Sequence, residues 1–327
     1  MKNRIENPVV SVVIPVKNGV QTLRDCLNGI FSQTLADHLE VIIIDSGSTD
    51  GTLELLKEYP VIVHSISPKS FNHGDTRNIG ASLAKGEFIV FTVQDAIPCD
   101  NSWLETLVAH FDDPKVDAVC GQQVVDHHPS KNPLQWFRPA GLADVYKVCA
   151  PHFDHLSDRE KHELCRWDDV NAAYRRNALK EIPFRNVSFG EDTLWAKDAL
   201  TLGKTIVYDY RARVWHYHHQ SFKFYFKRSY IIYYLDYRHF NYLSRGQFYP
   251  KALAKITYNL LRMQMPLTKK AYWIGYNIRL ITAKTLAKMI FKGYLVFAGE
   301  NGIDRGLKTF CQQIPQGTQK KLNAQFS

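Results

Sequence analysis

Two aspartates follow apolar runs at positions where an open α/β sheet would bind a ligand. Asp45 ends one run and precedes the polar segment Ser46–Gly51, and Asp95 follows the run Glu87–Val93. Ligands of such sheets bind beyond the carboxyl ends of the strands. Asp45 is therefore expected to accept a hydrogen bond from a base or ribose, and Asp95 to hold a divalent cation against a diphosphate. For Asp45, a turn whose polar side chains cap the next helix is an equally weighted alternative.

A pair of histidines, His216 and His218, lies in the sequence Trp-His-Tyr-His-His at the end of another predicted strand. Imidazole nitrogens bind divalent transition metals, so both rings can complete a cation site with Asp95. The alternative for either histidine alone, at equal weight, is a ring bonded to backbone or water.

Arg77 and Asn78 belong to a helix predicted over residues 76–84. Backbone N–H groups in the first turn of a helix favour anions, and a guanidinium there binds phosphate through two hydrogen bonds. The alternative is an exposed helix start with Arg77 in solvent.

An acidic pair, Glu191 and Asp192, opens a further helix predicted over residues 192–202. The helix dipole favours an ionised carboxylate at this end, and an ionised aspartate facing a pocket can act as a general base. Judged locally, an ordinary helix cap is the better explanation.

The elements that would position these side chains alternate between strands and helices. This alternation predicts an α/β fold with a doubly wound, mostly parallel sheet flanked by helices. Residues 122–168 lack periodicity and are expected to shape a substrate pocket. Strands are predicted over residues 9–16, 40–45, 61–64, 87–93, 116–120, 205–208 and 213–217.

The composition changes near residue 221. Residues 221–327 hold 18 Lys and Arg against 3 Asp and Glu, whereas residues 1–220 hold 23 against 29. We therefore predict two domains, 1–220 and 221–327, the second a basic, aromatic-rich helical extension. Within it an apolar helical face bordered by lysines suits an anionic membrane surface, and packing of the aromatics on the first domain is an equally weighted alternative. The predicted face consists of Ile274, Ile278, Ile281 and Met289, with Lys284, Lys288 and Lys292 beside it.

Three features bear on location. The chain opens without a signal-peptide pattern, no stretch approaches the ~18–20 consecutive apolar residues of a membrane span, and the six cysteines form no Cys-x-x-Cys pair. The expectation is a cytoplasmic protein, at most peripheral on the inner face of the plasma membrane.

Taken in order, these motifs resemble the inverting family-two glycosyltransferases with a GT-A fold, over about residues 9–219. The matching segments are Val-Ser-Val-Val-Ile-Pro-Val-Lys-Asn, Asp-Ser-Gly-Ser-Thr-Asp-Gly-Thr, Arg-Asn-Ile-Gly-Ala, the Asp95 edge and Glu191-Asp192. A finer similarity, to the bacterial rhamnosyltransferase-like branch, lies in Phe-Asn-His-Gly-Asp-Thr-Arg-Asn, Gln-Asp-Ala-Ile-Pro, Gly-Gln-Gln and Val-Trp-His-Tyr-His.

The resemblance implies transfer from a dTDP- or UDP-linked sugar, with rhamnose favoured, to a glycan or lipid-linked acceptor in surface-polysaccharide assembly. Asp192 would be the catalytic base, and Asp95, His216 and His218 would hold Mg²⁺ or Mn²⁺. Most relatives carry Asp-x-Asp at the strand edge, but Val93 occupies the first position here, which leaves metal dependence open. The implied donor contacts are Pro15, Asn18, Asp45, Ser48, Asp50, Arg77, Asn78, Gln94 and Asp95, and the implied acceptor or pocket residues are Gln122 and Glu191.

Two other functions compete with this one. A sugar nucleotidyltransferase also uses a parallel sheet with metal-binding carboxylates, but usually opens with a Gly-rich signature that this N-terminus lacks. A nucleic-acid-binding protein could use the basic, aromatic extension, and its binding would depend steeply on salt. We expect no nucleic-acid partner, because the lysines flank an apolar face.

Overall fold

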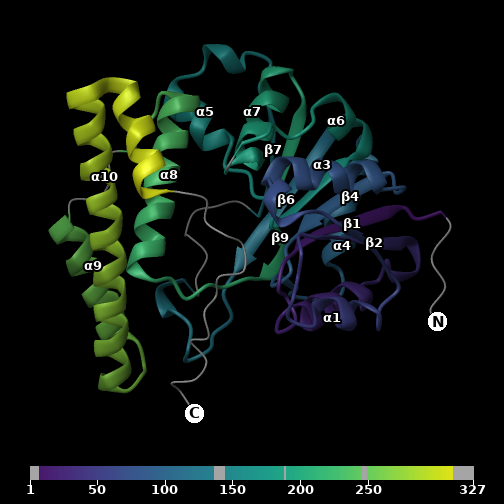
Figure 1. The fold of residues 1–327 in the computed structure, drawn as a ribbon, viewed down its shortest axis with the longest axis horizontal. Helices are drawn as coiled ribbons and strands as arrows, with labels where there is room; N and C mark the ends of the chain where they lie inside the picture. The colour runs from purple at the N-terminus through teal and green to yellow at the C-terminus, as the bar shows by residue number, and fades with distance from the viewer. Residues whose placement is uncertain (1–6, 136–143, 188, 245–248, 312–327) are drawn as a thin grey trace.

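A computed structural model describes residues 7–135, 144–187, 189–244 and 249–311. A nine-stranded sheet lies between helices, and three helices follow it towards the C-terminus (Figure 1). The strands are β1 (Val10–Val16), β2 (Leu39–Asp45), β3 (Val61–Ser65), β4 (Phe88–Thr92), β5 (Ile97–Pro98), β6 (Val116–Val124), β7 (Val145–Cys149), β8 (Asn171–Arg175) and β9 (Thr205–Trp215). The helices are α1 (Leu23–Phe31), α2 (Thr52–Leu56), α3 (His73–Leu83), α4 (Trp103–Val108), α5 (Asp158–Leu164), α6 (Arg176–Glu181), α7 (Glu191–Thr201), α8 (Phe222–Phe240), α9 (Tyr249–Arg262) and α10 (Leu267–Phe310).

The sheet confirms the α/β class but is mixed rather than mostly parallel. Its order is β3-β2-β1-β4-β8-β6-β9-β5, with β7 also pairing with β9. The pairs from β3 to β4 are parallel, as predicted. β8 then inserts antiparallel between β4 and β6, and β5 and β7 are antiparallel to β9. The expectation of a mostly parallel sheet fails at β8. This strand, although late in the sequence, pairs antiparallel with β4 near the middle of the sheet.

Helices cover both faces of the sheet. α1, α2 and α4 bury their apolar sides against one face, and α6 and α7 pack against the other. β1 and β2 are buried along their whole length, which explains their unbroken apolar sequence. Gly80 lets α3 approach β1 closely, because a Cβ at this position would lie 2.3 Å from Cγ1 of Val13.

Helix α3 begins at His73, three residues before its predicted start. The side-chain oxygen of Asn72 caps it by accepting from the backbone N–H groups of Gly74 and Asp75, at 2.9 and 3.1 Å. Arg77 therefore lies in the second turn, and the prediction that it lies in the first turn is wrong.

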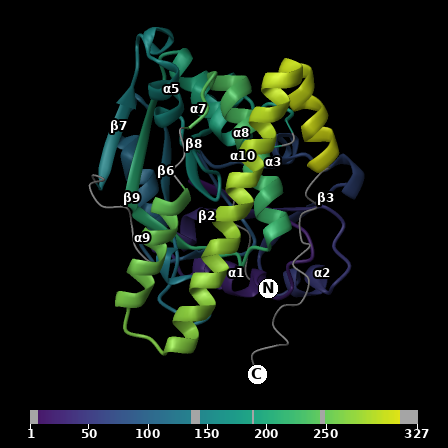
Figure 2. The same cartoon turned by 90° about the vertical axis from the view of Figure 1, so that its left-hand side faces the viewer.

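The C-terminal extension, residues 221–327, is helical where the structure describes it, and it starts with α8 one residue past the predicted domain boundary. Aromatic rings of α8 pack against α10 in an apolar cluster, in which Tyr230 and Phe291 are fully buried. α9 and α10 lie on the outside of the molecule (Figure 2). Within the described residues, no helix is long and apolar enough to cross a bilayer.

The predicted apolar face of α10 is only partly exposed. Ile274, Ile278 and Ile281 are half-buried, and only Met289 among the four is largely exposed, at 65%. The reason is that α9 packs along this part of α10, where Leu260 joins a cluster with Trp273, Tyr276 and Leu280.

The extension is joined to the sheet domain by buried polar contacts. The side-chain amides of Asn132 and Asn277 exchange two hydrogen bonds, at 2.9 and 3.1 Å. Gln220 donates its backbone N–H to the hydroxyl of Tyr276, at 2.9 Å. α10 is therefore fixed next to the strand end that carries the two histidines.

Candidate active site

The loops after β1 and β2 form one hydrogen-bonded unit. Asn18, at a left-handed φ of 50°, donates its backbone N–H to Oγ of Ser48 at 2.8 Å, and its side-chain oxygen accepts from Thr49 at 2.9 Å. Asp50 accepts from the backbone of Val20 at 3.2 Å. Residues Asn18, Ser48 and Asp50 thus lie together beyond the two strand ends, and their contact with a donor stays a prediction.

Asp45 is buried at the end of β2 and holds the following loop. Its carboxylate accepts from the backbone N–H of Gly47 at 3.0 Å and from Oγ of Ser48 at 2.5 Å. These contacts correspond to the structural alternative considered for Asp45. Pro15 is buried in β1 opposite Ile44, and a donor contact from Pro15 or Asp45 stays untested.

Gln94 joins the end of β4 to the end of β1. Its side-chain amide makes two hydrogen bonds with the backbone of Lys17. It accepts from the N–H at 2.8 Å and donates to the carbonyl oxygen at 3.2 Å. Asp95, the next residue, is thereby placed at the same edge of the sheet as the loops after β1 and β2.

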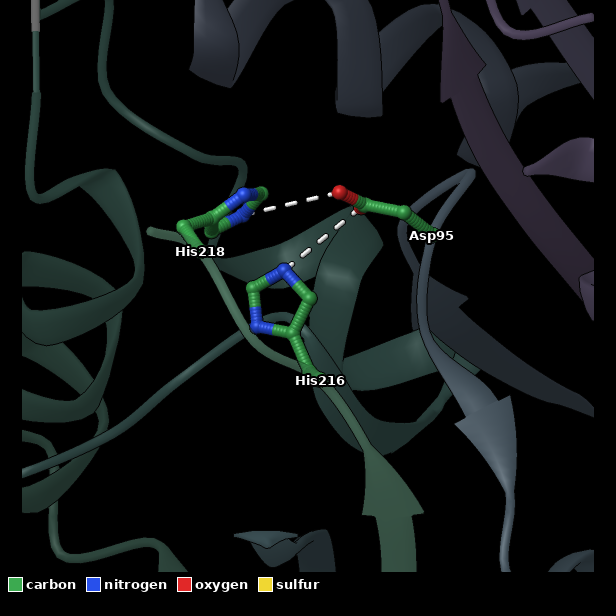
Figure 3. Close-up of side chains that lie close together, drawn as sticks. All are labelled: Asp95, His216 and His218. Carbon is green, nitrogen blue, oxygen red and sulfur yellow. Dashed lines mark ion pairs between the residues drawn. The ribbon is translucent and has the colours of Figure 1, made fainter. Parts of the chain in front are cut away.

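Asp95 faces the two histidines that follow β9 (Figure 3). Nε2 of His216 lies 3.5 Å from Oδ1 of Asp95, and Nε2 of His218 lies 3.5 Å from Oδ2. Each of the three residues offers one possible ligand atom, and these three atoms all lie within 4.8 Å of one another. The structure therefore brings together the three residues predicted to bind a metal.

The chemistry of this donor set fits a divalent cation. One carboxylate and two imidazoles suit a transition-metal ion such as Mn²⁺ better than Mg²⁺, which prefers oxygen ligands. Val93 cannot serve as a further ligand, because its side chain has no donor atom, and it packs against the core formed with α1 and α4. Among the described residues, the two imidazoles supply the possible ligand atoms beside Asp95.

Charge on Asp95 is favoured by its neighbours. Burial opposes ionisation, but the ring of His216 and the nearby His218 outweigh it, so the pKa of Asp95 lies below its usual range. Burial lowers the pKa of His218, which favours the neutral ring that a metal requires.

Arg77 lies in a buried acidic cluster instead of facing solvent. Its Nη1 donates to Oε1 of Glu191 at 2.6 Å, and its Nε lies 3.0 Å from Oδ2 of Asp169. All three side chains are nearly inaccessible to solvent. With its guanidinium engaged by two carboxylates, Arg77 acts as a structural counter-charge, and this arrangement does not support the expected diphosphate contact.

Asp169 retains its proton more strongly than an ordinary aspartate. Burial and the charge of Glu191 outweigh the effect of Arg77 and raise the pKa of Asp169 to about 7. The hydroxyl of Tyr174 donates to Asp169 and accepts from the indole N–H of Trp167 at 2.5 Å. The cluster is therefore a connected polar network within the apolar core.

Asp192 lies at the edge of this cluster, in the first turn of α7. Its carboxylate accepts from the backbone N–H of Thr193 at 2.7 Å and from the backbone N–H of Asp169 at 3.4 Å. Burial, followed by the charges of Glu191, Asp169 and Asp168, raises the pKa of Asp192 well above its usual range. The expected ionising effect of the helix start is thus overcome, and Asp192 is a stronger base once it has lost its proton.

The other predicted pocket residues differ in their placement. Asn78 uses both ends of its amide on the backbone of Phe184, at 2.8 and 3.0 Å, so it is a structural residue in this conformation. Glu191 is buried and pairs with Arg77, and its contact with a ligand stays a prediction. Gln122 lines a cavity of about 420 Å³ together with Asp144, Tyr210, Arg213 and Trp215, among others.

Sequence reasoning missed Asp168 and Asp169. They precede β8 in a region that lacks periodicity, and an adjacent pair of acids between Trp167 and a strand was the available signal. Asp169 pairs with Arg77 and Asp168 accepts from Gln123, and both of these partners are far away in the sequence.

Comparisons with known proteins bear on the family of this chain. The model of the family described as glycosyl transferase family 2 matches residues 11–183. The O-antigen chain rhamnosyltransferase RfbN of Salmonella typhimurium is 33% identical over 214 residues, and the match spans 62% of this chain and 62% of that protein, less than two thirds of its length. The O-antigen chain rhamnosyltransferase WbaN of Salmonella anatum is 32% identical over 238 residues, 67% of this chain and 70% of that protein.

One solved structure extends the likeness beyond the matched segment. S. aureus TarS, residues 1–349, in complex with UDP-GlcNAc, has a TM-score of 0.52 and 18% identity, with 94% of this chain and 81% of that chain covered. At this identity the likeness bears on the fold alone, and it agrees with a GT-A-like arrangement.

Proposed function

Because the chain belongs to glycosyl transferase family 2, we propose that it is an inverting glycosyltransferase that moves rhamnose from a dTDP-linked donor to an acceptor hydroxyl. The acceptor would be a growing surface glycan or a lipid-linked saccharide. The observation that carries the proposal is the convergence of Asp95, His216 and His218 at the same sheet edge as the loops after β1 and β2. The names of the rhamnosyltransferase relatives support the choice of sugar, and UDP-linked hexoses are the alternative donors.

In the proposed reaction, Asp192 accepts the proton of the acceptor hydroxyl as its oxygen attacks the anomeric carbon. The bond from that carbon to the diphosphate oxygen breaks on the opposite side, so the configuration inverts. Asp95, His216 and His218 would hold a divalent cation, which when bound stabilises the negative charge of the leaving diphosphate. Arg77 keeps Glu191 and Asp169 in place next to the base.

For the acceptor, the cavity beside Gln122 offers a suitable lining. Trp215 provides an aromatic surface on which a sugar ring can pack, and Arg213 and Gln122 provide hydrogen-bond donors. We assign this cavity to the acceptor saccharide.

Donor binding tests the proposed function directly. Thermal unfolding would be followed with dTDP-rhamnose, dTDP, UDP-glucose and GDP-mannose, each with and without Mn²⁺. A donor at a hundred times its Kd stabilises the native state by about 2.7 kcal/mol, so the midpoint should rise with dTDP-rhamnose and rise further when Mn²⁺ is added.

The variant Asp95→Asn should lose the Mn²⁺-dependent part of this rise, whereas Asp37→Asn, at an exposed position, should retain it. A rise with UDP-glucose alone would overturn the choice of dTDP-rhamnose. If none of the nucleotides shifts the midpoint, the proposed function itself is contradicted.

We also propose that the outer face of α10 contacts an anionic membrane surface. Met289, Val296 and Phe297 are 65, 77 and 90% exposed, and together with Leu286 they share one side of the helix. The extension that carries them has 18 basic residues against 3 acidic residues, so its charge complements anionic lipids. This face replaces the one predicted from Ile274, Ile278 and Ile281.

Vesicle flotation checks this attachment. The full chain should float with vesicles of phosphatidylcholine and phosphatidylglycerol and float less with phosphatidylcholine alone, because both the apolar face and the charge contribute. The triple variant M289E/V296E/F297E should stay at the bottom of the gradient. Leu202→Glu, at an exposed leucine of the sheet domain, is the matched control. Equal flotation of the triple variant and the unaltered chain would rule out this face.

A further inference from the structure

A hydrogen-bonded path leaves the predicted cation site on the side away from Asp95. His216 faces Asp95 with Nε2, at 3.5 Å, and contacts Oε1 of Gln123 with Nδ1, at 2.6 Å. The side-chain nitrogen of Gln123 then donates to Oδ2 of Asp168. The function proposed above gives Gln123 no role.

The donors and acceptors along this path determine how the Gln123 amide is oriented. A carboxylate only accepts hydrogen bonds, so the NH₂ group of the amide faces Asp168 and its carbonyl oxygen faces His216. Since a carbonyl oxygen also only accepts, Nδ1 of His216 carries the hydrogen in this contact. In the neutral ring, Nε2 then keeps its lone pair, and Nε2 is the atom on the Asp95 side (Figure 3).

The backbone holds Asp168 and sets the direction of the Gln123 side chain. Asp168 accepts at its other oxygen from the N–H of Val170, at 3.0 Å. On β6 the register shifts between Cys120 and Gln122, and a Cβ at Gly121 would lie 2.3 Å from Nδ2 of Asn171. Such a bulge re-aims the side chains that follow it, and here the side chain of Gln123 reaches both His216 and Asp168.

We propose that Gln123 is a positioning residue that holds His216 in the tautomer with a free Nε2, and that Asp168 sets the orientation of Gln123. The inference deepens the proposed function, because it rests on the cation site of Asp95, His216 and His218. Hydrogen-bond partners of metal-binding histidines are typically worth 10–100-fold in metal affinity. Gln123 thus increases the affinity of a site that has only one carboxylate.

The test compares three variants of the full chain. Gln123→Met keeps the side-chain volume and removes both hydrogen bonds. Gln123→Glu keeps an acceptor for Nδ1 of His216 but loses the donor to Asp168. Gln122→Met is the matched control, since the neighbouring Gln122 lines the cavity and not the histidine. Mn²⁺ affinity is measured by electron paramagnetic resonance, and the tautomer of His216 by ¹⁵N NMR of the cation-free protein at a pH where the ring is neutral.

We expect His216 to be an Nδ1–H tautomer in the unaltered chain and to lose this preference in Gln123→Met. Mn²⁺ affinity should fall about 10–100-fold in Gln123→Met, fall less in Gln123→Glu, and stay within about twofold in Gln122→Met. An Nε2–H tautomer in the unaltered chain would overturn the proposal without any variant. Unchanged Mn²⁺ affinity in Gln123→Met would overturn it as well.

These outcomes separate the inference from the function on which it rests. If the unaltered chain binds no Mn²⁺, the proposed cation site fails. The NMR measurement still shows whether Gln123 orients His216, because it uses the protein without a cation.

Discussion

Replacing Asp192 with asparagine should lower the rate of sugar transfer by about 10²–10⁴-fold, the usual contribution of a general base. Asparagine has nearly the same shape as aspartate, so the contact with the backbone of Thr193 can persist while the basic oxygen is lost. Donor binding, measured by thermal shift, should stay within about twofold, because in the proposed reaction Asp192 acts on the acceptor hydroxyl.

The matched control is Asp198→Asn on the same helix, α7. Asp198 pairs with the half-exposed Arg185 and does not contact the acidic cluster around Arg77, so transfer should continue at the normal rate. A nearly normal rate in Asp192→Asn would remove Asp192 from the mechanism.

The pH profile gives a second readout of the same variant. A base works only after losing its proton, and burial with three acidic neighbours raises the pKa of Asp192. The acid limb of kcat/KM should therefore lie at higher pH than for an ordinary aspartate, with activity rising as pH rises through that pKa. Asp192→Asn should lose this limb from its residual activity.

Replacing Arg77 with methionine should destabilise the protein by about 3–5 kcal/mol, the usual cost of removing one partner from a buried ion pair. The substitution leaves Glu191 and Asp169 buried without their shared cation. Chemical denaturation at several pH values measures the free energy of unfolding.

The pH dependence of this loss has a definite sign. Asp169 binds its proton more tightly in the folded state, where its pKa is raised to about 7, than in the unfolded chain. Its contribution to stability is therefore complete below the unfolded pKa and is lost as pH rises through about 7. Without Arg77 this loss should increase, so Arg77→Met should be most destabilised at alkaline pH.

The control for Arg77 is Arg24→Met, which removes the exposed Arg24–Glu58 pair at 2.7 Å. Exposed pairs contribute little to stability, so its unfolding midpoint should barely change. A small effect of Arg77→Met at all pH values would show that the cluster is not held by this arginine, and would restore a direct role for Arg77 at the diphosphate.

The sequence alone predicted the elements whose signals are local. β1 and β2 are buried on both faces, so their apolar runs identified them, and the polar segments after them identified the strand ends. Because the carboxyl ends of parallel strands share one edge, Asp95 could be assigned to a ligand-binding edge before the structure was known. The charge difference that defines the extension likewise needs only counting.

Only the tertiary structure decided how distant groups are paired. Arg77 and Glu191 are 114 residues apart, and no local pattern indicates that the guanidinium lies buried against acids rather than at a helix start. Pairing between residues far apart in the sequence also placed β8 between β4 and β6. It likewise formed the path from His216 through Gln123 to Asp168. Which side chains of α10 face solvent depended on where α9 packs. Local sequence determines backbone preference and burial pattern, whereas the ionisation and orientation of a side chain depend on partners that only the folded chain brings within a few ångströms.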